Sequence, residues 1–376
     1  MVLVMSNLSI RGKISRRGFL TYSAAAVGVV ALGIYGSKAD VHAVPGLRDP
    51  KAEHAVQAVM AALESHQLVA LGEAHQLQEE HDFIIDLLKN LKPGTINDIV
   101  VEFGSAGYQD VMDRFTAGQP VEDQVLRQVW RNTLITGANP VWDAPVYERF
   151  FRTVRALNQT LPAAHKLRVL LGDPAIDWEN VRRKEDWGKL VLQRDAHYAG
   201  VVEREVLQKG RKALLIAGTS HLLRGVRAEG DPSQPPDMAP INVTAHLDAA
   251  HPGSVFVIDV LMTIPGDQSV QADELRSWPK PGFARLAGTW LGVETVAGNS
   301  NIQVLMRGSA ADAVLYLGKS EELTASRANP ALYMGGAYAE ELERRGKLLT
   351  QWGIQGPGDP LQQALKIAKK GPRYFA

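Results

Sequence analysis

The feature that most constrains the fold is a series of short, continuously apolar segments that alternate with amphipathic helical segments. Four of these apolar segments end in a glycine together with one or two titratable side chains. They predict strands over residues 67–71, 98–103, 167–171 and 212–217. Strands that are apolar throughout are buried on both faces, which is typical of parallel sheets with helical crossovers. The pattern therefore predicts an α/β fold with a mostly parallel β-sheet flanked by helices on both faces.

Apolar residues spaced by three and four positions predict helices between these strands. The predicted helices span residues 51–66, 76–91, 107–117, 121–132, 145–159, 184–209 and 338–349. Two further strands are predicted over residues 254–261 and 313–317. Loops rich in proline, glycine and polar residues are predicted near 228–240 and 264–283, and loops of this length are usually lids, binding loops or disordered segments. We therefore expect residues 44–376 to form a single α/β domain with two loop insertions.

The composition excludes several classes of function. The chain has 41 Lys and Arg residues and 41 Asp and Glu residues, so its formal net charge is zero. A dedicated nucleic-acid binder carries a basic patch and a high pI, so no nucleic-acid partner is predicted. There are 0 cysteines, which excludes disulfides, thiolate zinc sites, cysteine nucleophiles and iron–sulfur clusters.

The first 43 residues are predicted to be an export signal rather than part of the fold. Arg16 and Arg17 precede an apolar stretch over residues 21–36, and the small residue Ala43 offers a cleavage site. The paired arginines resemble the twin-arginine export motif, which implies a periplasmic or otherwise exported protein. The alternative is an uncleaved anchor, because the apolar stretch approaches the length that spans a membrane. Contact with a membrane is therefore expected only through this segment, if it is uncleaved.

The residues at the strand ends predict a shared site. The four ends carry Glu73 and His75, then Glu102, then Asp173, and finally His221. In open α/β sheets, ligands bind beyond the carboxyl ends of the strands, so these side chains should meet at one edge. The alternative is a turn or capping role, which is strongest for Asp173 because aspartate favours turns. Because a Gly-x-x-His element occurs at two strand ends, a role in a site is favoured over a turn role for His75 and His221.

Two imidazoles with nearby carboxylates can perform two kinds of chemistry. His75, Glu102 and His221 are candidate ligands for a divalent metal that activates water and polarises a carbonyl. Without a metal, one histidine can act as a general base while a glutamate holds its tautomer. The chain lacks the His-x-x-x-His spacing that would favour zinc, so the spacing leaves both alternatives open.

Four elements of the chain resemble motifs of the superfamily that contains ChaN haem-binding proteins, erythromycin esterases and Tiki/TraB/GumN proteins. Leu71–His75 resembles the first Gly-x-x-His motif, Val100–Glu102 the strand that carries a glutamate, Arg194–Ala199 the Arg-Asp/Asn helix motif, and Ile216–Leu222 the second Gly-x-x-His motif. They occur in the expected order over residues 68–222, whereas residues 225–376 show no clear resemblance.

The resemblance implies an α/β sandwich with its site at the strand ends and leaves two functions open. The first is an exported hydrolase that cleaves an ester or amide in a small-molecule or peptide substrate, with a divalent metal such as Mn, Zn or Fe or with a histidine base. The catalytic residues would then be Glu73, His75, Glu102, Arg194 and His221. Of these, Arg194 would stabilise developing negative charge. The alternative is a haem-binding protein for iron uptake that uses a His or Tyr axial ligand.

Overall fold

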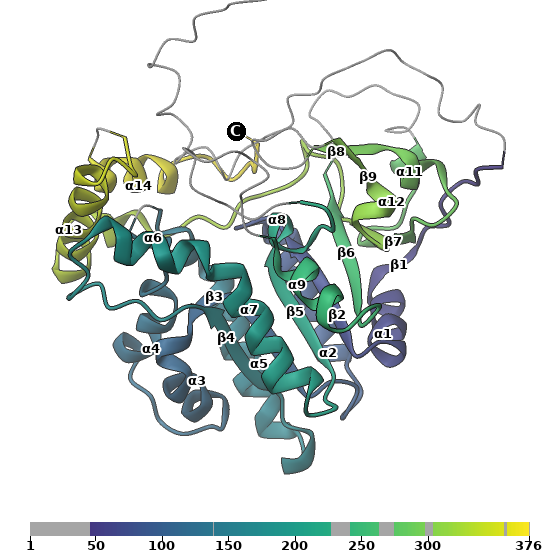
Figure 1. The fold of residues 1–376 in the computed structure, drawn as a ribbon, viewed down its shortest axis with the longest axis horizontal. Helices are drawn as coiled ribbons and strands as arrows, with labels where there is room; N and C mark the ends of the chain where they lie inside the picture. The colour runs from purple at the N-terminus through teal and green to yellow at the C-terminus, as the bar shows by residue number, and fades with distance from the viewer. Residues whose placement is uncertain are drawn as a thin grey trace, which may run out of the picture.

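A mostly parallel sheet of eight strands lies at the centre of the part of the chain that the structure describes (Figure 1). Its strands are β1 (Glu53–His54), β2 (Leu68–Glu73), β3 (Asp98–Ser105), β4 (Arg168–Asp173), β5 (Ala213–Gly218), β6 (Val255–Leu261), β7 (Gly282–Arg285) and β10 (Ala313–Tyr316). Their order is β1-β7-β10-β6-β2-β5-β3-β4, and the strands from β10 to β4 are parallel. β7 pairs antiparallel with both β10 and β1. The predicted fold class is confirmed.

The computed structural model leaves several segments of the chain undescribed. It describes residues 46–137, 139–226, 241–262, 274–297, 304–356 and 359–375. The predicted export signal over residues 1–43 and the predicted loop at 228–240 lie outside these ranges, as do residues 264–273 of the second predicted loop. That second loop ends earlier than predicted, because residues 282–283 belong to β7 and pair with β10.

Helices cover both faces of the sheet. Against one face pack α1 (Ala55–Ser65), α2 (Gln78–Asn90), α3 (Gln109–Thr116), α4 (Asp123–Arg131) and α5 (Pro145–Thr160), and against the other pack α7 (Arg194–Val202) and α9 (Val243–Ala250). The pleat of β2 explains this arrangement: Val69 and Leu71 face the first layer, whereas Leu68 and Ala70 face the second. Both sets of side chains are buried, as the continuously apolar sequence predicts.

Shorter elements and two C-terminal helices complete the described chain. They are η2 (Ala106–Tyr108), η3 (Val141–Asp143), η4 (Ala163–His165), α6 (Lys184–Leu192), η5 (Glu203–Leu207), α8 (Thr219–Leu222), α11 (Trp290–Val293), β8 (Thr295–Ala297), β9 (Val304–Met306), α12 (Arg307–Ala310), η7 (Pro330–Tyr333), α13 (Ala337–Gln351) and α14 (Pro360–Ala368). Figure 1 shows α13 and α14 at one side of the molecule and the β8–β9 hairpin at the other. The helix predicted over residues 184–209 is divided at Gln193, so that Arg194 begins a separate helix.

The register of the parallel strands brings the predicted site residues to one edge of the sheet. β2 and β5 pair Glu73 with Gly218, and β3 and β4 pair Ser105 with Asp173. An irregularity in β3 between Val101 and Ser105 lies where Glu102 stands. The carboxyl ends of four strands therefore meet, as the sequence predicts.

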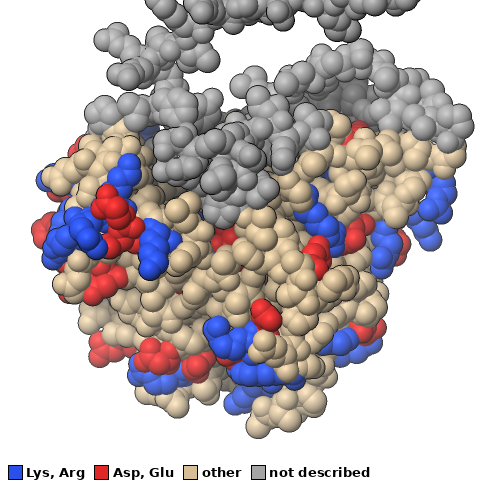
Figure 2. Space-filling view, viewed as in Figure 1, with Lys and Arg blue, Asp and Glu red and all other residues tan. Residues whose placement is uncertain are grey.

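No helix among the described residues has both the length and the apolar character needed to cross a bilayer. On the face shown in Figure 2, basic and acidic side chains are interspersed rather than separated into large patches of one sign.

Candidate functional site

The imidazole of His75 lies between two buried glutamates. Its Nδ1 is 3.2 Å from Oε2 of Glu73, and its Nε2 is 4.0 Å from Oε1 of Glu102. The His75 side chain is 21% exposed, whereas the Glu73 and Glu102 side chains are 0% and 1% exposed. Of these three groups, the imidazole is therefore the one that solvent or a substrate reaches.

Glu102 is the centre of a buried charge network. Its Oε1 accepts a hydrogen bond of 2.9 Å from Nη2 of Arg194 and lies 3.4 Å from Nε2 of His221. Its Oε2 accepts a hydrogen bond of 2.6 Å from the backbone N–H of Gly218. Burial alone would raise the pKa of Glu102, but His221, Arg194 and His75 hold it well below its usual range. Glu102 is therefore an ionised carboxylate at neutral pH.

Two carboxylates hold His221 in its protonated form. Its Nδ1 is 2.7 Å from Oδ1 of Asp195, and Glu102 lies on the other side of the ring. Burial lowers the pKa of His221, but Asp195 and Glu102 outweigh this effect and raise the pKa to about 10. A protonated ring has no lone pair with which to accept a proton or bind a metal. This arrangement favours His75 over His221 as the base or metal ligand.

Glu73 is oriented by groups on the side away from the solvent. Its Oε1 accepts hydrogen bonds from Nε2 of His81 at 2.9 Å and from the Tyr147 hydroxyl at 2.7 Å. Burial raises the pKa of Glu73, but His75 and His81 lower it to about 2. The other oxygen, Oε2, is thereby directed toward His75. Although Oε2 of Glu73 and Nδ1 of His75 lie 3.2 Å apart, their orientation does not form a hydrogen bond, and neither atom has another partner among the described residues.

The donor atoms of Glu73, His75 and Glu102 form a candidate site for a divalent metal ion. Their ligand atoms all lie within 4.8 Å of one another. Two ligands that are each about 2.0–2.2 Å from one ion lie roughly 3.0–3.5 Å apart, and Glu73 Oε2 and His75 Nδ1 match this spacing. Imidazole and carboxylate donors suit Zn, Mn or Fe. His221, a predicted ligand, is not among these three residues, although it lies beside Glu102.

All five residues predicted as catalytic lie in this one cluster. Asp173, for which a turn role was the strong alternative, accepts hydrogen bonds from Arg194 at 2.7 Å, from the Tyr198 hydroxyl at 2.8 Å and from the backbone N–H of Leu134 at 2.7 Å. It anchors Arg194 against Glu102. Asp195, His81 and Tyr147 also contact the site residues and were not predicted from the sequence. Only Asp195 had a signal, because it follows Arg194 in the Arg-Asp motif.

The glycine of the second Gly-x-x-His element is required by the close approach of β5 to His75. A Cβ atom at Gly218 would lie 2.9 Å from Cε1 of His75 and 3.2 Å from Oε2 of Glu102. The histidine ring would have to move toward solvent to relieve this contact. If the cluster is catalytic, Gly218→Ala should lower kcat by about 10- to 100-fold, the effect of a displacement of about 1 Å. Steady-state kinetics should show this loss while the variant remains folded by circular dichroism.

Gly188→Ala is the matched control, because a Cβ at Gly188 on α6 meets nothing within 4 Å. The control should keep the parent rate. Equal rates for the parent and Gly218→Ala would contradict the proposed contact with His75.

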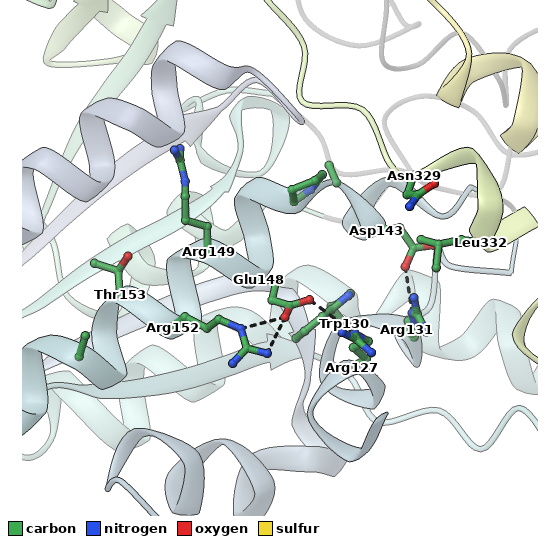
Figure 3. A pocket seen from close by; sticks show the side chains of 13 residues that line it. Arg127, Trp130, Arg131, Asp143, Glu148, Arg149, Arg152, Thr153, Asn329 and Leu332 are labelled. Atoms are coloured by element: carbon green, nitrogen blue, oxygen red, sulfur yellow. Dashed lines mark hydrogen bonds and ion pairs between the residues drawn. The ribbon is translucent and has the colours of Figure 1, made fainter. Parts of the chain in front are cut away.

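A cavity of about 660 Å³ lies beside α4 and α5, and its lining includes none of the cluster residues (Figure 3). Four arginines line it, namely Arg127, Arg131, Arg149 and Arg152. All four are already paired, Arg127 and Arg152 with Glu148, Arg131 with Asp143, and Arg149 with Asp82. Figure 3 draws the pairs of Arg152 and Arg131. No histidine is among the described residues that line this cavity, so it does not provide the predicted chemistry.

Comparison with known proteins supports the resemblance drawn from the motifs. A family model described as "Haem-binding uptake, Tiki superfamily, ChaN" matches residues 59–168. This segment includes Glu73, His75 and Glu102 but ends before Arg194 and His221. No curated protein matches the chain in sequence.

Solved structures resemble the fold at low sequence identity. A succinoglycan biosynthesis protein is 9% identical with a TM-score of 0.52, over 70% of this chain and 90% of its own. A Bacillus cereus protein is 13% identical with a TM-score of 0.49, over 73% and 93%. An erythromycin esterase is 12% identical with a TM-score of 0.46, over 70% and 93%. These likenesses concern the fold alone.

Proposed function

We propose that this protein hydrolyses an ester or amide bond in a small-molecule or peptide substrate, with a water molecule activated at His75. The observation that carries this proposal is the position of the His75 imidazole, partly exposed between the carboxylates of Glu73 and Glu102. The family model that matches residues 59–168 covers all three residues.

The surrounding residues suit this chemistry. Burial lowers the pKa of His75, but Glu73 and Glu102 raise it above its usual value, which stabilises the imidazolium that forms when the ring takes a proton from water. Glu73 is itself fixed by His81 and Tyr147, so the ring has a defined orientation. A divalent metal held by Glu73, His75 and Glu102 would supply an activated water and a polarised carbonyl.

The proposal is tested with the purified full chain. Its metal content is measured by mass spectrometry, and its hydrolysis of chromogenic esters and amides is followed before and after treatment with a chelator. Loss of activity with the metal, and its return on adding Mn²⁺, Zn²⁺ or Fe²⁺, would identify the metal-activated form of the mechanism. Activity that survives the chelator would identify His75 as the base. No turnover of either substrate class, with or without these metals, would contradict the proposal.

Haem binding for iron uptake is a second candidate function, favoured by the description of the matching family model. Both ring nitrogens of His75 face buried carboxylates, at 3.2 Å from Glu73 and 4.0 Å from Glu102, whereas an axial imidazole must present one nitrogen to the iron. We therefore expect a haem titration, followed by absorption, to show no tight one-to-one complex with a Soret band. A stoichiometric Soret band that disappears in His75→Ala would replace hydrolysis with haem uptake as the function.

We also propose export to the periplasm, on the basis of Arg16 and Arg17 and the small residues that end at Ala43. Replacing both arginines with lysine should leave the precursor uncleaved in the cytoplasm. Immunoblots of cytoplasmic and periplasmic fractions measure this directly. Normal processing and export of the double variant would argue against the twin-arginine route.

A further inference from the structure

The turn that carries His75 is held by hydrogen bonds from several separate elements. The backbone N–H of Ala74 donates to Oε2 of Glu80 at 2.9 Å, and that of Gln76 donates to the Tyr147 hydroxyl at 3.0 Å. From the far end of the sequence, the Tyr374 hydroxyl donates to the carbonyl of His75 at 3.1 Å. The turn closes one hydrogen bond of its own, from the Leu77 N–H to the Ala74 carbonyl at 3.0 Å, and is otherwise held from outside.

One residue of this turn has an unfavourable backbone conformation. Gln76 has φ of +66°, and it is the one residue other than glycine with a positive φ in the described part of the chain. A side chain with a Cβ is disfavoured there, and such a conformation persists only when its surroundings enforce it. The carbonyl of Gln76 accepts a hydrogen bond of 2.8 Å from the N–H of Ser326, and its side-chain amide donates to Val141 at 2.9 Å. These contacts enforce the conformation next to His75.

Ser326 and Tyr374, which contact the turn, belong to one small structure. We call it the C-terminal strap and define it as residues 323–326 and 372–374. Its two segments pair through Ala325 N–H to the Pro372 carbonyl at 2.7 Å and Tyr374 N–H to the Leu323 carbonyl at 2.9 Å. The strap then binds the start of α2, because Oγ1 of Thr324 donates to Glu79 at 2.5 Å. It is therefore attached to the His75 turn and to the start of the helix that follows it.

A second C-terminal segment, residues 329–338, contacts Asp143, the residue after a tryptophan that packs against the His75 ring. The hydroxyls of Tyr333 and Tyr338 donate to Asp143 at 3.1 Å and 2.8 Å. Figure 3 shows Asp143 near Asn329 and Leu332 of this region. The residue before Asp143 is Trp142, whose ring lies 4.7 Å from that of His75 in an edge-on contact. This segment thus acts on the His75 ring only through Asp143 and Trp142, whereas the strap contacts the His75 backbone directly.

We infer that the C-terminal strap completes the site by positioning His75, and that Tyr374 is a positioning residue. Its hydroxyl holds the carbonyl of His75 while Ser326 holds that of Gln76, so the strained turn keeps the imidazole between Glu73 and Glu102. The effect on catalysis rests on the proposed hydrolytic function. The effect on the turn does not depend on it.

The test uses Tyr374→Phe in the full chain, which removes the hydroxyl and keeps the ring. Loss of one hydrogen bond should raise the equilibrium constant for local opening of the turn about fivefold. We expect hydrogen–deuterium exchange of the amides at residues 76–78 to rise by about this factor, with little change elsewhere in the sheet. If the chain hydrolyses a substrate, kcat should fall severalfold while KM changes little. Thr324→Val, which removes the hydroxyl that binds Glu79 without changing the side-chain shape, should raise exchange at the same amides.

Tyr108→Phe is the matched control, since its hydroxyl accepts a hydrogen bond of 2.6 Å from Asn132, away from the His75 turn. It should leave exchange at residues 76–78 unchanged. Parent-like exchange there in both Tyr374→Phe and Thr324→Val would overturn the inference. So would a rise spread evenly over the whole sheet, which would indicate loss of global stability alone. If the parent shows no hydrolysis, the exchange measurement still decides the inference.

Discussion

For the proposed hydrolysis, His75→Ala is expected to lower kcat by about 10²- to 10⁴-fold, the range supplied by a positioned acid–base group. The same change should affect folding little. Glu102 keeps its hydrogen bonds to Arg194 and Gly218, and Glu73 keeps those to His81 and Tyr147. Kinetics on the substrate that the parent hydrolyses, together with thermal unfolding followed by circular dichroism, measure the two effects separately.

The control for this variant is His165→Ala. His165 is exposed and lies in η4, which precedes β4 and therefore stands at the opposite edge of the sheet. It should retain the parent rate. Metal content of the His75 variant adds a second result: loss of the metal identifies His75 as a ligand, and retention identifies it as the base. A kcat within threefold of the parent would exclude His75 from the chemistry.

The location of the site could be predicted because it follows from a rule about parallel sheets. Each Gly-x-x-His element follows a continuously apolar strand, and the carboxyl ends of such strands meet at one edge. This reasoning places His75 and His221 together, although they are far apart in the sequence. It also brings Glu102 to them, because β3 neighbours β5 in the sheet.

The position of Arg194 could not be derived in this way, since it was predicted within a long helix. The structure divides that helix at Gln193, and Arg194 begins α7, next to the end of β4. A residue in the first turn of a helix can reach a strand end that a residue in its middle cannot. Its contacts with Asp173 and Glu102 therefore depend on a helix boundary that the apolar pattern does not mark.

The partners of the site that come from distant segments had no local signal at all. Tyr147 stands on α5 as one of several buried aromatic residues, and Tyr374 lies near the end of the sequence. Their hydroxyls meet Glu73 and the His75 carbonyl only because of how these segments cross the edge of the sheet. Periodicity predicts which face of an element is buried, but it does not predict which hydroxyl meets which carboxylate.

Arg194→Met is expected to have the largest effect on stability, with a loss of about 3–5 kcal/mol in the free energy of unfolding. The Arg194 side chain is 7% exposed, and its guanidinium pairs with Glu102 at 2.9 Å and Asp173 at 2.7 Å. Methionine fills a similar volume but leaves two buried carboxylates without this cation. His221 remains beside Glu102 and offsets part of the cost. Urea unfolding gives the free energy, and an unchanged m-value shows that the change lies in stability.

The size of this loss should depend on pH in a defined direction. The folded state holds the pKa of Glu102 well below its usual value of 4.5, so ionised Glu102 contributes stability that is present above pH 4.5 and is lost as the pH falls through the folded pKa. Because Arg194 is one cause of that depression, the difference between parent and variant should be largest near neutral pH and smaller in acid. Arg183→Met is the control, since its partner Asp186 forms an exposed pair with it. A difference between parent and Arg194→Met that grows in acid would mean that the arginine acts through packing rather than through its charge.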